Sequence, residues 1–238
     1  MRNFKFIIFL ILVGIYPVMG FAKTPTIINH FGNDIVNSFA NWPAFVIAGG
    51  ALAAAELTQA DQSIQDHFRN GPHLGKADTI AGIAGAAYVV DTSSILLYGI
   101  GKLAKDEKLA LTGEAMFEAL AITEVSTLGL KAAFRRTRPD GGHYSFPSGH
   151  AARCFAAATV LQTFYGLPAG IPAYLAAAFI SFTRMDQNFH YASDVVFGAA
   201  LGAGIGWGTA LFHKKLGDKV VIVPTASNGP GLSVYYRF

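Results

Sequence analysis

Long apolar segments rich in alanine and glycine, with little charge, most constrain how this chain can fold. Only 14% of its 238 residues are charged and 52% are hydrophobic, whereas soluble domains carry about 25% charged residues. Short turn signals such as Asn70-Gly71-Pro72 separate these segments, a pattern typical of closely packed helices. The sequence therefore predicts an all-α fold, a helical bundle. We expect its helices at about residues 34–40, 43–59, 77–103, 110–135, 149–165, 168–184 and 191–213.

The N-terminal segment has the order typical of a secretory signal peptide. Arg2 and Lys5 precede an apolar run from Phe6 to Val18, and small residues follow at Gly20-Phe21-Ala22. We predict a signal peptide over residues 1–22. An uncleaved membrane anchor is the alternative, because the apolar run is of borderline length.

The C-terminal residues break the helical pattern. Val220 to Thr225 and Leu232 to Phe238 are β-prone, and the turn signal Asn228-Gly229-Pro230-Gly231 lies between them. We therefore expect a β-hairpin tail over residues 216–238, following a helical domain over residues 23–215.

The helices have features of membrane spans. Val195 to Phe212 is uncharged for 18 residues, and His213-Lys214-Lys215 follows as a basic flank. Glu114, Glu118 and Glu124 recur within another predicted helix and must face protein, a cavity or water. Membrane embedding is the interpretation that we favour, and a soluble periplasmic domain is the alternative.

Charge and cysteine content exclude two classes of protein. The net charge is only +3, and the basic residues form no stripe with interleaved aromatic residues, so we expect no nucleic acid partner. Cys154 is the one cysteine, which excludes an internal disulfide framework.

Three polar clusters interrupt the apolar background. Taken singly, they are explained as helix-end cations, an N-cap serine and a surface pair at positions i and i+4. Taken together, they favour a phosphate site. The clusters are Lys131 with Arg138-Pro139, then Pro147-Ser148-Gly149-His150, then Thr183-Arg184 with His190 and Asp194.

Five residues from these clusters can bind a phosphate. Lys131, Arg138 and Arg184 supply three cations for charge-assisted hydrogen bonds. Ser148 and Gly149 open a predicted helix, where free backbone N–H groups and the helix dipole favour an anion.

The remaining residues can transfer the phosphoryl group. His190 can attack phosphorus through a neutral ring nitrogen, and Asp194 can accept the other ring N–H. His150 then serves as the general acid for the leaving oxygen and as the base for water. The cations already neutralise the transferred group and no zinc-like ligand spacing occurs, so we expect no metal and no cofactor in the reaction.

The three clusters carry a family resemblance. Lys-x6-Arg-Pro, Pro-Ser-Gly-His and Ser-Arg-x5-His-x3-Asp, in this order, are the signatures of the type 2 phosphatidic acid phosphatase and vanadium haloperoxidase superfamily, which this chain resembles over about residues 77–213. Thr183 replaces the usual serine and keeps its hydroxyl. The resemblance implies a helical bundle of the acid phosphatase type with its site at one end. It also implies that Lys131, Arg138, Ser148, Gly149 and Arg184 bind phosphate, and that His150, His190 and Asp194 are catalytic.

The resemblance further implies a function and a location. We expect a phosphatase that acts on a lipid phosphate or diphosphate, through a phosphohistidine, at the periplasmic face of a bacterial inner membrane. Phosphatidate, phosphatidylglycerophosphate, undecaprenyl diphosphate and lipid A are candidate substrates. The alternatives are a soluble periplasmic acid phosphatase, a vanadium haloperoxidase and a non-catalytic phosphate or lipid binder. The motifs specify neither the lipid nor an oligomeric state.

Overall fold

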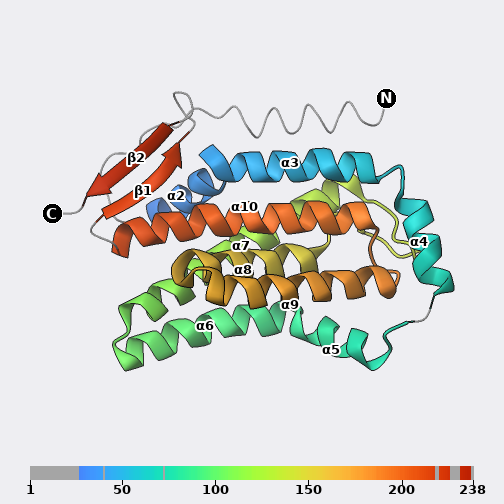
Figure 1. Ribbon diagram of the computed structural model, residues 1–238, viewed down its shortest axis with the longest axis horizontal. Helices are drawn as coiled ribbons and strands as arrows, with labels where there is room; N and C mark the ends of the chain where they lie inside the picture. The colour runs from blue at the N-terminus through green and yellow to red at the C-terminus, as the bar shows by residue number, and fades with distance from the viewer. Residues whose placement is uncertain (1–26, 40, 72, 218–219, 226–230, 237–238) are drawn as a thin grey trace.

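The computed structural model describes residues 27–39, 41–71, 73–217, 220–225 and 231–236. They form an α-helical bundle around the long helix α10, which Figure 1 shows running between α3 and α8. The predicted all-α bundle is confirmed, and the predicted signal peptide over residues 1–22 lies outside the described residues. The helices are α2 (Ile27–Phe39), α3 (Asn41–Leu57), α4 (Asp61–Asn70), α5 (Lys76–Ala84), α6 (Ala87–Ala104), α7 (Glu107–Phe134), α8 (Gly149–Tyr165), α9 (Leu167–Asp186) and α10 (Ala192–Gly217).

The C-terminal residues form two strands, β1 (Val220–Thr225) and β2 (Gly231–Tyr236). They pair antiparallel, with Val220 opposite Tyr236 and Thr225 opposite Gly231. Figure 1 shows this pair near the C-terminal end of α10. The link over 226–230 lies outside the described residues.

Three helix predictions need correction. The helix expected over 34–40 begins earlier, at Ile27, and ends at Phe39. The helix expected over 77–103 is divided into α5 and α6, which meet at a 46° bend. At this bend a Cβ on Gly85 would lie 2.5 Å from Ile180 Cγ2 and 3.0 Å from the His150 ring, so the backbone approaches both side chains closely. Helix α4 was not predicted, because most of its residues are polar and it lacks the long apolar run on which the predictions depended.

Glycines on α10 let it approach α8 closely. A Cβ on Gly202 would lie 1.8 Å from the Ala152 carbonyl oxygen, and one on Gly206 would lie 2.5 Å from that of Ala156. On the same face, a Cβ on Gly198 would lie 2.6 Å from the Ser148 oxygen. These contacts bring the first turns of α8 and α10 together, and those turns carry two of the three polar clusters.

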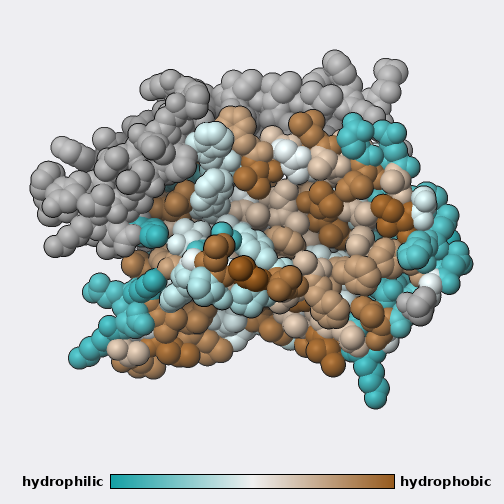
Figure 2. Space-filling view, viewed as in Figure 1, coloured by the Kyte–Doolittle hydropathy of each residue, from teal (hydrophilic) through white to brown (hydrophobic). Residues whose placement is uncertain are grey.

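The surface between the ends of the bundle is apolar. Figure 2 shows brown side chains over the middle of this face and teal ones gathered around α4 and at the outer ends of α5 and α6. By length and composition, residues Ala192–Lys214 of α10 can cross a membrane, and the described residues hold up to three spans if each bent helix pair counts as one. Exposed large apolar residues include Ile80, Ile83, Leu96, Leu103, Val125, Leu128, Leu175 and Phe179.

Candidate active site

The predicted site residues come from the ends of four helices and from the loops between them. Lys131 lies in the last turn of α7 and Arg184 in the last turn of α9, whereas Ser148 caps α8 and Asp194 lies in the first turn of α10. Arg138 belongs to the loop before α8, and His190 to the loop before α10. Successive helices run in opposite directions, so the ends of α7 and α9 and the starts of α8 and α10 lie at the same end of the bundle. The three clusters are therefore brought together there.

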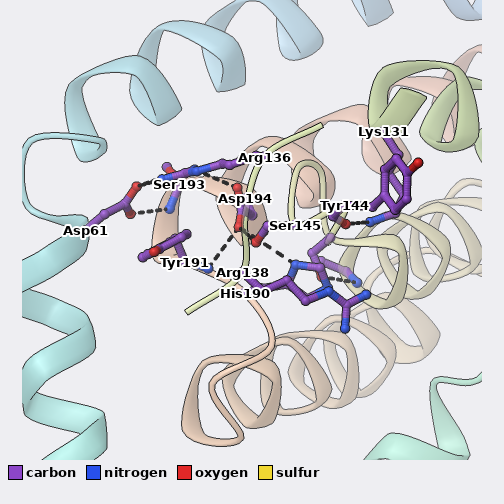
Figure 3. A network of polar contacts seen from close by, with 12 residues as sticks. Asp61, Lys131, Arg136, Arg138, Tyr144, Ser145, His190, Tyr191, Ser193 and Asp194 are labelled. Carbon is purple, nitrogen blue, oxygen red and sulfur yellow. Dashed lines mark hydrogen bonds and ion pairs between the residues drawn. The ribbon is translucent and has the colours of Figure 1, made fainter. Parts of the chain in front are cut away.

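Asp194 is fully buried and held from several sides (Figure 3). One carboxylate oxygen accepts a hydrogen bond from Arg136 Nη1 at 2.6 Å. The other accepts from Ser145 Oγ at 2.5 Å and from the Tyr191 backbone N–H at 2.9 Å. With its orientation fixed by these donors, the carboxylate provides a rigid partner for the neighbouring histidine.

His190 faces this carboxylate from a buried position. Its Nδ1 lies 3.8 Å from Asp194 Oδ2, which is an ion-pair distance and about 1 Å longer than a hydrogen bond. Burial lowers the pKa of His190, Asp194 opposes this effect, and the cationic Lys131 and Arg138 lower the pKa further. The ring is therefore neutral near pH 7, the form that a nucleophilic imidazole needs.

The three predicted cations surround the loop that carries His190. The Arg138 and Arg184 guanidinium carbons lie 5.7 Å and 5.5 Å from the centre of the Phe189 ring, within cation–π range of one residue that adjoins His190. Lys131 lies close enough to affect the pKa of His190. The three cations can therefore meet one anion beside the histidine.

Loop carbonyls orient two of these cations. Lys131 Nζ donates to the Tyr144 carbonyl at 2.6 Å, and Arg138 Nε donates to that of His143 at 3.0 Å. Burial, followed by the charge of Arg138, lowers the pKa of Lys131 to about 8. A bound phosphate would oppose both effects.

His150 lies against helix α5. Its Nε2 is 3.1 Å from the Gly82 carbonyl oxygen, and a Cβ on Gly82 would lie 2.8 Å from Arg184 Nη2. Burial, followed by the charge of Arg184, lowers the pKa of His150 to about 4. The ring is neutral in the free protein, and the negative charge of a bound phosphate would raise its pKa toward the range of a general acid.

Ser148 acts as a helix cap. Its hydroxyl accepts from the Ala151 N–H at 3.5 Å, and its own N–H donates to the Asp194 carbonyl at 3.0 Å. The Ser148 O–H is still available to donate to a phosphate oxygen while the hydroxyl oxygen accepts from Ala151. Gly149 follows at the first position of α8, where the helix dipole favours an anion.

Sequence reasoning missed the network behind Asp194. Arg136 Nη2 donates to Asp61 Oδ2 at 2.6 Å while its Nη1 binds Asp194 (Figure 3). Ser193 donates to Asp61 through its N–H at 3.0 Å and its hydroxyl at 2.5 Å. Nothing in the pattern distinguished Arg136 from the neighbouring Arg135, and Asp61 belongs to the unpredicted α4.

Arg153 belongs to a structural contact beside the site. Its Nε donates to Glu124 Oε1 at 2.8 Å, and its Nη1 donates to the Gly85 carbonyl at 3.2 Å. This side chain joins α8 to α7 and to the bend between α5 and α6. Glu124 therefore faces protein, which is one of the three settings expected for it.

The low pKa of Lys131 predicts how activity depends on pH. Phosphate binding needs the cationic form, so kcat/KM should fall as pH rises through about 8. In Lys131→Arg the guanidinium stays protonated, and the alkaline fall should move to higher pH. Rate profiles of both proteins between pH 5 and about 10 measure this. An unchanged alkaline limb in Lys131→Arg would assign the titration to another group.

Comparison with known proteins supports these findings. Residues 114–218 match the family model of the PAP2 superfamily. A lipid A 1-phosphatase of Rhizobium johnstonii is 30% identical over 182 residues, which cover 64% of this chain and 72% of that protein. A lipid A 1-phosphatase of Porphyromonas gingivalis is 42% identical over 80 residues, 32% of this chain, but this match spans only 18% of that longer protein.

Two solved structures share the fold. A transmembrane PAP2 type phosphatidylglycerolphosphate phosphatase from Bacillus subtilis has a TM-score of 0.63 at 20% identity, over 73% of this chain and 96% of that chain. LpxE of Aquifex aeolicus has a TM-score of 0.53 at 26% identity, over 61% of this chain and 92% of that chain. The motif residues gathered at one end of this fold, the matching family model and the relative aligned over most of its length agree: the chain belongs to the PAP2 superfamily.

Proposed function

We propose that this protein is a lipid phosphatase that works through a phosphohistidine on His190. The observation that carries the proposal is the position of His190, which is buried, faces the fixed Asp194 carboxylate and adjoins the cations of Lys131, Arg138 and Arg184. A neutral imidazole beside a cationic pocket is suited to attack a phosphate whose charge the pocket neutralises.

The proposed reaction has two displacements. In the first, the ring nitrogen of His190 that faces away from Asp194 forms a bond to phosphorus, and the bond from phosphorus to the lipid oxygen breaks. His150 gives its proton to that oxygen, and Asp194 stabilises the cationic phosphohistidine. In the second, His150 takes a proton from water, the water oxygen bonds to phosphorus, and the P–N bond breaks to release phosphate and neutral His190.

The surface and the relatives support a lipid substrate. The site lies at one end of a bundle whose flanks are apolar (Figure 2), so the phosphate of a membrane lipid could reach the cations while its acyl chains stay in the bilayer. Two similar proteins are named lipid A 1-phosphatases. We therefore propose lipid A 1-phosphate, at the periplasmic face of the inner membrane, as the first substrate to test.

A substrate panel tests this function. The protein, purified in detergent, is assayed for phosphate release from lipid A, phosphatidate, phosphatidylglycerophosphate, undecaprenyl diphosphate and a soluble aryl phosphate. We expect lipid A to be hydrolysed at least on the order of tenfold faster than the aryl phosphate, as measured by kcat/KM, because binding of the lipid part contributes to catalysis. We also expect inhibition by vanadate.

Each alternative function predicts a different result, in this panel or in a separate assay. Preference for the aryl phosphate, with release of the protein by osmotic shock, would identify a soluble acid phosphatase. Bromide oxidation in the presence of vanadate and peroxide would identify a haloperoxidase. Lipid binding without phosphate release from any substrate would identify a binding protein.

A further inference from the structure

A second polar cluster lies near the other end of α10. Asp34 of α2, Glu118 of α7 and His213 of α10 each offer one ligand atom, and these atoms lie within 4.8 Å of one another. His213 Nε2 is 3.1 Å from Glu118 Oε2 and 3.5 Å from Asp34 Oδ2. Asp194 and His213 are 19 positions apart (213 − 194) on one helix, which places the two clusters about 28 Å apart along its axis.

We propose that this cluster binds a divalent transition-metal ion, for which Zn²⁺ is the test case. One imidazole nitrogen and two carboxylate oxygens are donors that zinc accepts, and water can take a fourth position. In a tetrahedral site with bonds of about 2.0–2.1 Å, neighbouring ligand atoms lie about 3.3 Å apart. The two distances from His213 Nε2, 3.1 Å and 3.5 Å, lie on either side of this value.

A divalent metal ion suits this geometry better than a protonated His213 does. If His213 were an imidazolium, its single Nε2 hydrogen could point directly at only one of the two carboxylates. Both distances are also longer than the 2.7–2.9 Å or so that is common for a charge-assisted hydrogen bond. A metal ion accepts the Nε2 lone pair and binds both carboxylates at once.

The surroundings suit a structural metal. The Asp34 and His213 side chains are fully buried and that of Glu118 is 17% exposed. The ligands come from three helices, so the ion would hold α2 against α7 and α10. The phosphate site lies at the opposite end of the bundle, so an ion held here would take no part in the reaction proposed above.

Metal content is the direct test. The full chain is purified in detergent through a tag that lacks histidine, loaded with Zn²⁺, dialysed, and analysed by mass spectrometry of the metal. We expect about one zinc ion per chain and a rise in Tm of roughly 5 °C with bound zinc, since the ion binds only the folded state. A wild-type chain that retains no zinc overturns the proposal and leaves His213 as an imidazolium between two carboxylates.

Variants locate the ion. Glu118→Gln keeps the shape of the side chain and removes its charge, and Asp34→Asn does the same on α2. Each should weaken zinc binding by at least about tenfold. Glu114→Gln, one turn earlier on α7, is the matched control, and His190→Ala controls for binding at the catalytic site. Both controls should retain zinc. Equal zinc binding by Glu118→Gln and Glu114→Gln would contradict the proposal, whatever the phosphatase assay shows.

Discussion

Replacing His190 with alanine is expected to lower kcat by about 10⁴-fold or more, because it removes the atom that bonds to phosphorus. His190 is buried among the cations and beside Asp194, and the structure offers no other histidine beside that carboxylate among the described residues. Phosphate release from the preferred lipid, together with trapping of ³²P-labelled protein in alkaline detergent, measures the effect.

The label and a matched control distinguish chemistry from folding. Wild-type protein should carry an acid-labile label that His190→Ala lacks, as expected for a P–N bond. His67→Ala, which removes an exposed histidine of α4, should keep both the label and the turnover. Substantial turnover by a folded His190→Ala protein would exclude His190 as the nucleophile.

The second large effect is expected from Arg136→Leu, although Arg136 does not touch the phosphate in the proposed reaction. Its guanidinium bridges Asp61 and Asp194, two buried carboxylates. Loss of one partner from a buried pair costs about 3–5 kcal/mol, and since the Arg136 side chain is 25% exposed, we expect about 2–3 kcal/mol. This corresponds to a fall in Tm of roughly 5–10 °C.

Arg136→Leu should also impair catalysis through Asp194. Without the guanidinium, Asp194 loses its Oδ1 donor, and we expect kcat to fall by about 10²-fold with little change in KM. Arg136→Lys should recover part of the loss, because an ammonium can reach one carboxylate but not bridge both. Arg135→Leu is the control, since Arg135 bonds to the Ala132 carbonyl of its own helix. A rise in KM at unchanged kcat would instead place Arg136 on the substrate.

Local sequence patterns were sufficient to predict most of the helices and to identify the motif residues. Apolar runs between turn signals predicted α7, α8, α9 and α10 to within a few residues, because helix formation and helix ends depend on neighbours within a few positions. The same reasoning failed where packing between helices decides the secondary structure. It joined α5 to α6 across Gly85, whose backbone lies against His150 and Ile180, and it overlooked α4, whose Asp61 and Gln65 are buried against polar groups.

By itself, then, the sequence determined a helical bundle with three polar motifs at or near helix ends, since short stretches of residues are enough to predict each of those features. Only the tertiary structure selected Arg136 as the partner of Asp194. Likewise, only the fold brings together Asp34, Glu118 and His213. The physical reason is the same in both cases: contacts between side chains 58 or 95 positions apart depend on how helices pack, and no local pattern records that packing.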